Sequence, residues 1–167
     1  MTAAQRVIDG LRDRQLTVST AESLTGGLVA SAIVEVPGAS DVFRGGVIAY
    51  ATELKHDILA VDAALLAEHG AVHPDVAVEM ATGVRERCSS DWGVATTGVA
   101  GPDPQDGHPV GEVYVAVVTG LGSEVRGLFL TGDRADIRAA TVHAALDLLE
   151  ECLEDLGPAH SGDAAPS

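Results

Sequence analysis

Three patterns meet in the stretch Leu16-Thr-Val-Ser-Thr-Ala-Glu-Ser-Leu-Thr-Gly-Gly-Leu-Val-Ala-Ser-Ala-Ile-Val34, and together they indicate the fold. The first five residues alternate in the manner of a short β-branched strand. Ala21 to Gly27 then forms a Ser/Thr/Gly turn, and the remaining residues form a small apolar helix. A strand, a tight turn and a helix open a βαβ unit, so this stretch predicts an α/β protein.

The segments on either side continue the alternation of helices and strands. Periodicity predicts helices at Thr2–Arg14, Thr52–Leu59, Ala63–His69, from Pro74 to about Cys88, and Asp133–Leu156, strands at Gly45–Tyr50 and Trp92–Thr97, and an antiparallel hairpin of Glu112–Thr119 with Glu124–Leu130. The expected architecture is a three-layer α/β/α sandwich with a mixed, mostly parallel sheet and one antiparallel hairpin. We expect a single domain over residues 1–156 and a disordered tail over 157–167, which is rich in Ala, Pro, Ser, Gly and Asp.

Composition limits the classes of partner. The chain carries 10 Lys and Arg against 25 Asp and Glu, a net charge of −15, so we expect no nucleic acid to bind. It contains no apolar run of membrane-spanning length and opens with no signal peptide, which indicates no membrane contact and a cytoplasmic location. Aromatic residues make up only 3% of the chain, so the core must be aliphatic.

Ser23 is the strongest local candidate for chemistry, because it follows a predicted strand at the point where open α/β sheets bind ligands. The amides of the next residues, which include Thr25, Gly26 and Gly27, open a helix and could hold an anion or an oxyanion. Local pattern equally allows Ser23 or Thr25 to be a simple helix cap, with the glycines as packing contacts.

Lys55 is the only lysine in the chain and lies shortly after Tyr50, at the end of another predicted strand. A lysine acts as a base when burial or neighbouring charges lower its pKa. A codon bias that replaces surface lysines would also leave a single one, and composition does not decide between the two explanations.

Two further sites lie later in the chain. Thr97 and Gly98 end a predicted strand and begin a loop that runs to Gly111, which is long enough to suggest a function. Arg134 and Arg138 share one face at the start of the last helix and could bind a phosphate, or could pair with Asp133 and Asp136. The six histidines form no metal-binding spacing, so we expect no metal and no other cofactor.

Several blocks together resemble the C-terminal domain of the CinA family, the nicotinamide-nucleotide amidases of the PncC type. The blocks occur in the family's order and span roughly residues 4–156: Ala21-Glu-Ser-Leu-Thr-Gly-Gly27, Phe43-Arg-Gly-Gly-Val-Ile-Ala-Tyr50, Glu53-Leu-Lys55, His69-Gly-Ala-Val72, Thr97-Gly-Val-Ala-Gly-Pro102, Pro109-Val-Gly111 and Gly132-Asp-Arg134. The longer members' amino-terminal nucleotide-processing domain has no counterpart here, so the resemblance is to the stand-alone form.

The resemblance implies an amidohydrolase that converts nicotinamide mononucleotide to nicotinate mononucleotide and ammonia, a step of pyridine-nucleotide salvage. It implies Ser23 as nucleophile, Lys55 as general base, Tyr50 as a residue that orients or relays within the pair, no cofactor, and a homo-oligomer. From these roles we infer that amides of Thr25 to Gly27 or of Thr97 to Gly98 hold the oxyanion. Arg134 and Arg138 are the candidates for the substrate phosphate, with the helix after Ser23 as the competing site.

The chain also departs from the family's pattern near the base and in the long loop. Ala51-Thr52 replaces a Ser-Asn pair, Leu24 stands where many relatives have cysteine, and the loop has His108 where lysine is common. These differences leave an alternative open, in which the chain is a non-catalytic nucleotide-binding or competence/damage-associated module.

Overall fold

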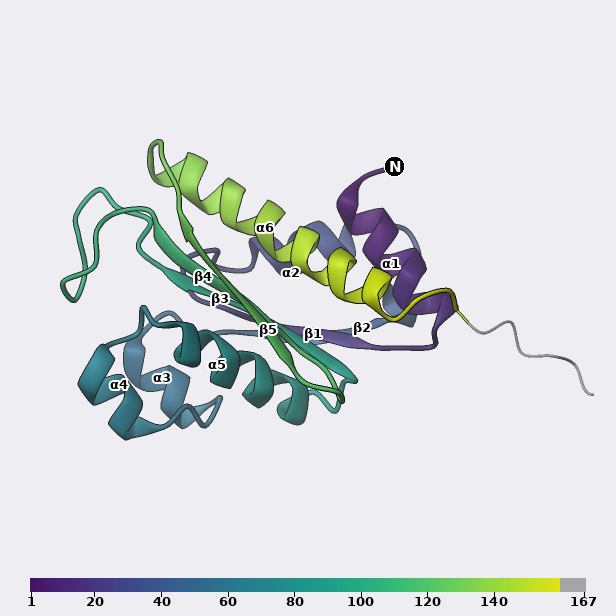
Figure 1. The fold of residues 1–167 in the computed structure, drawn as a ribbon, viewed down its shortest axis with the longest axis horizontal. Coiled ribbons are helices and arrows are strands. Elements are labelled where there is room, and N and C mark those ends of the chain that lie inside the picture. Colours follow the sequence, from purple (N-terminus) through teal and green to yellow (C-terminus); the bar gives the residue numbers. More distant parts are fainter. Residues whose placement is uncertain (160–167) are drawn as a thin grey trace, which may run out of the picture.

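A computed structural model describes residues 1–159 and shows a five-stranded sheet between two layers of helices (Figure 1). The elements run in the order α1 (Ala3–Asp13), β1 (Val18–Glu22), α2 (Leu28–Val34), the short 3-10 helix η1 (Ala39–Asp41), β2 (Phe43–Ile48), α3 (Thr52–Asp57), α4 (Ala63–His69), α5 (Pro74–Arg87), β3 (Trp92–Gly98), β4 (Glu112–Val118), β5 (Ser123–Phe129) and α6 (Arg134–Asp155). The predicted α/β/α sandwich is confirmed.

The strand order in the sheet is β2-β1-β3-β4-β5. Strand β1 pairs in parallel with both β2 and β3, whereas β4 is antiparallel to β3 and to β5. Four of the five strands therefore point the same way, and β4 with β5 forms the predicted hairpin. The carboxyl ends of β1, β2 and β3 meet at one edge, which is where open α/β sheets bind their ligands.

The two faces of the sheet bury two separate aliphatic clusters. Helices α1, α2 and α6 cover one face, and α3, α4 and α5 cover the other (Figure 1). On α5 the side chains of Val76, Met80 and Val84 are fully buried, as their helical spacing predicts. Within residues 1–159 the buried members of the two clusters are aliphatic apart from Trp92 at the start of β3, in agreement with the low aromatic content.

Small residues let α5 pack close to the sheet. Ala21, Ala95 and Ala116 lie side by side on β1, β3 and β4 and face the cluster beneath α5. A Cβ added at Gly93 would lie 2.1 Å from the carbonyl oxygen of Ala81, so no larger residue fits at that position. Close contact with α5 buries the middle of the sheet and fixes the edge that carries Ser23.

Strand β1 begins and ends two residues later than the predicted strand at Leu16–Thr20. Parallel pairing with β3 continues as far as Glu22, which lies opposite Thr96, so Ala21 and Glu22 belong to the strand and not to the turn. Strand β2 is displaced in the opposite direction and ends at Ile48, before Tyr50. Long-range pairing decides both boundaries.

The end of the described chain packs onto α1. Arg14 Nη2 donates to the carbonyl of Gly157 at 2.5 Å, so the first residue of the predicted tail is held in place. The rest of that prediction, from residue 160 onward, lies outside the described residues. No helix within residues 1–159 is both long and apolar enough to cross a membrane.

Candidate active site

Ser23 directly follows β1 and lies at the carboxyl edge of the sheet. Its amide donates to the carbonyl of Thr96 at 3.1 Å, which continues the pairing of β1 with β3 by one residue. The chain then turns through Gly26 and Gly27, whose φ angles of 55° and 102° are left-handed and therefore favour glycine. Ser23 is 8% exposed and lines a pocket of about 130 Å³, so its hydroxyl is accessible without facing bulk solvent.

The carboxylate of Glu22 fills the start of α2. It accepts hydrogen bonds from the amides of Val29 at 2.8 Å and Ala30 at 3.1 Å, and from the hydroxyl of Thr25 at 2.6 Å. Glu22 is 1% exposed, and these three donors satisfy a charge that would otherwise be costly to bury. The protein's own carboxylate therefore takes the amides of Val29 and Ala30, so these two are not available to an anionic ligand.

Sequence reasoning did not single out Glu22. A signal was present, however, since a charged residue stands between a buried strand and a Ser/Thr/Gly turn. To predict its role, one would need to know that β1 extends through Glu22 and directs the carboxylate toward α2. Thr25 is likewise buried and shares a hydrogen bond of 2.8 Å with the hydroxyl of Thr96, so its side chain supports the turn and does not line the pocket.

Lys55 lies on α3 with its ammonium group against Ser23. Nζ is 3.1 Å from Ser23 Oγ, 2.8 Å from the carbonyl oxygen of Ala49 and 3.4 Å from that of Tyr50. The side chain is 1% exposed and ranks among the largest fully buried side chains of the described chain. The sequence places Lys55 32 residues after Ser23, and parallel pairing of β1 with β2 brings the two together.

Burial changes the acidity of this lysine. Loss of solvation lowers the pKa of Lys55 from 10.5 to about 8, against a partial opposing effect of the nearby Glu53 carboxylate. With that pKa, roughly a tenth of the amines are neutral at pH 7, whereas an ordinary lysine would be neutral in less than about 0.1% of molecules. The site therefore holds a hydroxyl beside an amine that can accept its proton.

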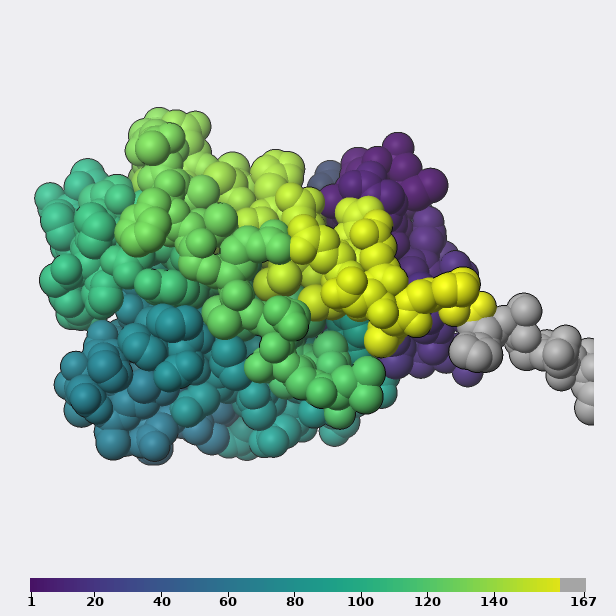
Figure 2. Space-filling view, viewed as in Figure 1, coloured from purple at the N-terminus to yellow at the C-terminus, as the bar shows by residue number. Residues whose placement is uncertain are grey.

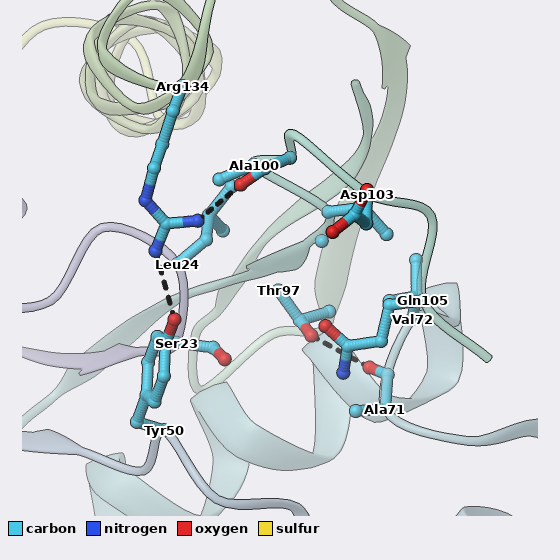
Figure 3. Close-up of a pocket in the computed structure, with 13 residues that line it drawn as sticks. Ser23, Leu24, Tyr50, Ala71, Val72, Thr97, Ala100, Asp103, Gln105 and Arg134 are labelled. Carbon is cyan, nitrogen blue, oxygen red and sulfur yellow. Dashed lines mark hydrogen bonds between the residues drawn. The ribbon is translucent and has the colours of Figure 1, made fainter. Parts of the chain in front are cut away.

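Tyr50 contributes its backbone, and not its phenol, to the Ser23 and Lys55 pair. Its carbonyl accepts from Lys55, but its hydroxyl accepts from Arg134 Nη2 at 3.0 Å and the side chain is 60% exposed (Figure 3). A proton relay through the phenol, one of the two roles expected for Tyr50, does not fit this arrangement. The second expected role, orientation of the pair, falls to the Tyr50 carbonyl.

The two arginines of α6 have different positions. Arg134 lines the pocket, where Nη1 donates to the carbonyl of Gly101 at 2.5 Å. Arg138 is not among the pocket residues. Its Nε donates to the carbonyl of Leu24 at 2.8 Å and its Nη2 to that of Thr25 at 3.3 Å. Of the two, only Arg134 therefore lines the pocket, and Arg138 supports the turn that carries Ser23.

Thr97 and Gly98 end β3 beside Ser23 and line the same pocket, as their position in the sequence predicts. The hydroxyl of Thr97 donates to the carbonyl of Ala71 at 2.7 Å and so ties the α4–α5 connection to the sheet edge. That connection supplies Ala71 and Val72 as an apolar wall.

The remaining wall of the pocket is the loop between β3 and β4. It contributes Val99, Ala100 and Gly101, and also two polar side chains, Asp103 and Gln105, that sequence reasoning missed (Figure 3). The loop's length signalled a function, but no pattern showed which of its residues faces inward. Its tip packs beside Gly70, where a Cβ would lie 3.1 Å from the Asp106 carboxylate, and Figure 2 shows this loop against the helical layer below it.

Within residues 1–159, no three His, Cys, Asp or Glu side chains are grouped so that they could hold a metal ion. The chemistry that the arrangement offers is that of a serine hydroxyl, an adjacent lysine amine and a small pocket beside both. Such an arrangement suits nucleophilic attack on a carbonyl group.

Comparison with known proteins gives a consistent family assignment. The model of the CinA C-terminal domain matches residues 1–153. A CinA-like protein from Frankia casuarinae is 46% identical over 163 residues, which cover 96% of this chain and 38% of that protein. A CinA-like protein from Geobacter sulfurreducens is 46% identical over 85% of this chain and 35% of its own length. The chain thus spans little more than a third of these curated relatives.

Solved structures agree with the sequence matches. A competence-damaged protein (CinA) superfamily protein from Klebsiella pneumoniae has a TM-score of 0.88 and 33% identity, and the match covers 92% of this chain and 96% of that one. The competence/damage inducible protein CihA from Agrobacterium tumefaciens has a TM-score of 0.86 and 37% identity, with 91% and 93% covered. The resemblance that the sequence blocks indicated is confirmed.

Proposed function

The chain belongs to the CinA C-terminal-domain family, and on that premise we propose that it is a serine/lysine amidohydrolase that converts nicotinamide mononucleotide to nicotinate mononucleotide and ammonia. The observation that carries the proposal is the buried contact of 3.1 Å between Lys55 Nζ and Ser23 Oγ. A hydrolase needs a base within hydrogen-bonding distance of its nucleophile, and the lowered pKa of Lys55 supplies one near neutral pH.

The proposed reaction proceeds through an acyl-enzyme. Neutral Lys55 takes the proton of the Ser23 hydroxyl as Oγ bonds to the carboxamide carbon. The tetrahedral intermediate then breaks its C–N bond, and Lys55 returns the proton to the departing nitrogen, which leaves as ammonia. Water attacks the acyl-enzyme as Lys55 takes one of its protons, and Lys55 passes that proton to Ser23 Oγ as the C–O bond breaks. The acid product then loses its own proton to solvent and leaves as the carboxylate.

The turn after Ser23 also offers donors for the oxyanion. Within residues 1–159 the amides of Leu24 and Thr25 have no protein acceptor, whereas that of Gly26 donates to the carbonyl of Ser23 at 3.1 Å. Leu24, which follows the nucleophile and lines the pocket, is our first candidate. Arg134 is the candidate for the phosphate, because it lines the pocket and two hydrogen bonds to protein groups leave further N–H donors on its guanidinium.

Ammonia release from nicotinamide mononucleotide tests the proposal. We expect turnover by the unaltered protein and a loss of at least about 1,000-fold in Ser23→Ala, which removes the nucleophile. Lys55→Arg should lose as much, because arginine does not give up its proton. Both variants should still bind the nucleotide, which calorimetry measures.

Two outcomes would contradict the proposal. Full activity in either variant would refute the roles of Ser23 and Lys55. Nucleotide binding without ammonia release by the unaltered protein would instead favour the non-catalytic, nucleotide-binding alternative. A homo-oligomer and a cytoplasmic location stay predictions, and sedimentation and cell fractionation test them.

A further inference from the structure

Two opposite charges line the pocket without pairing with each other. Arg134 and Asp103 both contribute to its wall, and Figure 3 shows them on either side of its upper part, with Ser23 below. Arg134 is bonded to Gly101 and Tyr50. The Asp103 carboxylate, in contrast, has no hydrogen-bond or ion-pair partner among residues 1–159. Asp103 is exposed at the rim of the pocket, so its two carboxylate oxygens are accessible to a ligand that enters it.

The loop holds Asp103 at a defined place. On one side of it, Arg134 binds the carbonyl of Gly101. On the other side, the backbones of Gln105 and His108 exchange hydrogen bonds of 3.1 and 2.8 Å. His108 is in turn bonded to the carboxylate of Glu112, at the start of β4, at 2.8 Å. Anchors on both sides reduce the ordering that a ligand would otherwise have to impose on this carboxylate.

The size of the pocket determines which part of a nucleotide Asp103 can meet. Its volume of about 130 Å³ is close to that of the ~150 Å³ cavity in which benzene binds. The pocket therefore has room for about one six-membered ring, and the apolar residues Leu24 and Val72 are among those that line it. The sugar and phosphate must then lie toward the mouth, where the two charged side chains are.

Asp103 and Arg134 differ in chemistry, and each suits a different part of the nucleotide. A carboxylate has two acceptor oxygens and no donor, so it suits a pair of hydroxyls and repels a phosphate, whereas a guanidinium suits the phosphate. We propose that Asp103 is a specificity-determining residue that accepts hydrogen bonds from the vicinal ribose hydroxyls of the substrate. This inference rests on the proposed amidase function and narrows its substrates to carboxamide nucleotides with a free diol.

The test compares substrates that differ only in these hydroxyls. We would measure kcat/KM of the unaltered protein and of Asp103→Asn for nicotinamide mononucleotide and its 2′-deoxy and 3′-deoxy analogues. The unaltered protein should prefer the nucleotide with both hydroxyls by about 10- to 100-fold, because a site built for a hydroxyl rejects an analogue without it. Asp103→Asn should lower that preference several-fold, because its amide has one acceptor oxygen and no charge, while it processes the deoxy analogues nearly as well as the unaltered protein.

Asp106→Asn is the matched control. It removes the same charge from the same loop at a residue that does not line the pocket, and it should keep the full preference. Reduced nicotinamide mononucleotide, whose ring is uncharged, tests whether the Asp103 carboxylate contacts the positively charged ring and not the ribose. If Asp103→Asn alters only the preference for the charged ring, Asp103 faces the ring and the proposal is wrong.

Equal losses on all three nucleotides in Asp103→Asn would also overturn the inference while leaving the amidase function intact. Dissociation constants measured by calorimetry on the Ser23→Ala background repeat the comparison without turnover. Binding that discriminates between hydroxyls, together with no ammonia release by the unaltered protein, would support the role of Asp103 and reject the amidase function. Binding that ignores the hydroxyls would reject the role of Asp103.

Discussion

The starts of α2 and α6 look alike in sequence but differ in what they can bind. Both follow a short polar turn, and at both the sequence allowed either an anion site or an ordinary helix cap. Glu22 occupies the first with a carboxylate that is 1% exposed, and Asp133 caps the second in a reciprocal arrangement with Asp136 at the protein surface. In both helices a carboxylate of the chain itself accepts from the first free amides, so the positive charges at the site come from two side chains, Lys55 and Arg134.

The difference lies in burial. In the exposed cap of α6, hydrogen bonds between the capping groups and water are replaced on folding by hydrogen bonds within the protein. Such caps contribute about 1 kcal/mol to the free energy of unfolding. The buried carboxylate of Glu22 has no water to replace its donors, so its removal leaves polar groups unpaired. A helix start is an anion site only where the chain itself brings no carboxylate to it.

The largest expected effect comes from changing each carboxylate to its amide. Glu22→Gln should lower the free energy of unfolding by about 3 kcal/mol. The NH₂ group of glutamine would face N–H or O–H donors whose hydrogen bonds the carboxylate accepts, and those donors would be left unpaired. Asp133→Asn, the matched change at α6, should cost no more than about 0.5 kcal/mol, since asparagine caps helices as well as aspartate does. Urea denaturation of both variants measures the difference. Equal losses would show that burial does not distinguish the two starts.

The second prediction uses pH, which should act through Lys55 of α3, beside the turn that carries Ser23. Because the pKa of Lys55 is about 8, kcat/KM should rise roughly tenfold per pH unit below 8 and level off above it. A rate profile from pH 6.5 to 9.5 checks this, and a flat profile would remove Lys55 as the base.

The same shift has a consequence for stability. Between pH 8 and 10.5 the unfolded chain binds a proton at Lys55 that the folded chain has lost, so the free energy of unfolding should rise with pH across that window. The lowering corresponds to roughly 3 kcal/mol in full. Lys55→Met should abolish this rise, and denaturation at pH 7.5 and pH 10 compares the two proteins.

The smallest effect separates the two arginines of α6. Arg134→Ala should raise KM for nicotinamide mononucleotide about 10-fold and leave KM for the phosphate-free riboside little changed, because it removes a phosphate contact. Arg138→Ala should instead lower kcat, since it releases the carbonyls of Leu24 and Thr25 in the turn that carries Ser23. Steady-state kinetics on both substrates distinguishes them. The same KM increase in both variants would contradict the assignment of Arg134 to the phosphate and of Arg138 to the Ser23 turn.

Local pattern predicted most of the fold because hydrophobic periodicity reports which face of an element is buried. The helices α2 and α4 match their predicted bounds, and Val76, Met80 and Val84 point inward as expected. The boundaries of β1 and β2 were wrong by two residues, because strand ends depend on pairing partners that are distant in the sequence.

The site was predictable where residue type alone restricts the chemistry. A lone lysine and a serine at a strand end were visible in the sequence, and their contact followed only from the resemblance. The positions of Glu22, Asp103 and Arg138 were not visible. Arg138 bonds to a turn more than 110 residues earlier, and Glu22 reaches the start of α2 because pairing with β3 extends β1 to this position. Neither arrangement is recorded in local spacing.

The sequence by itself determined the alternation of helices and strands, the aliphatic core, the acidic exterior and the turn at Ser23. Those properties follow from side-chain size, charge and backbone preference, which are local. Only the tertiary structure decided that Lys55 is buried against Ser23, that Glu22 closes the start of α2, and that Arg134 and not Arg138 faces the pocket. Burial and hydrogen-bond partners come from long-range packing, and they turn an ordinary lysine into a base.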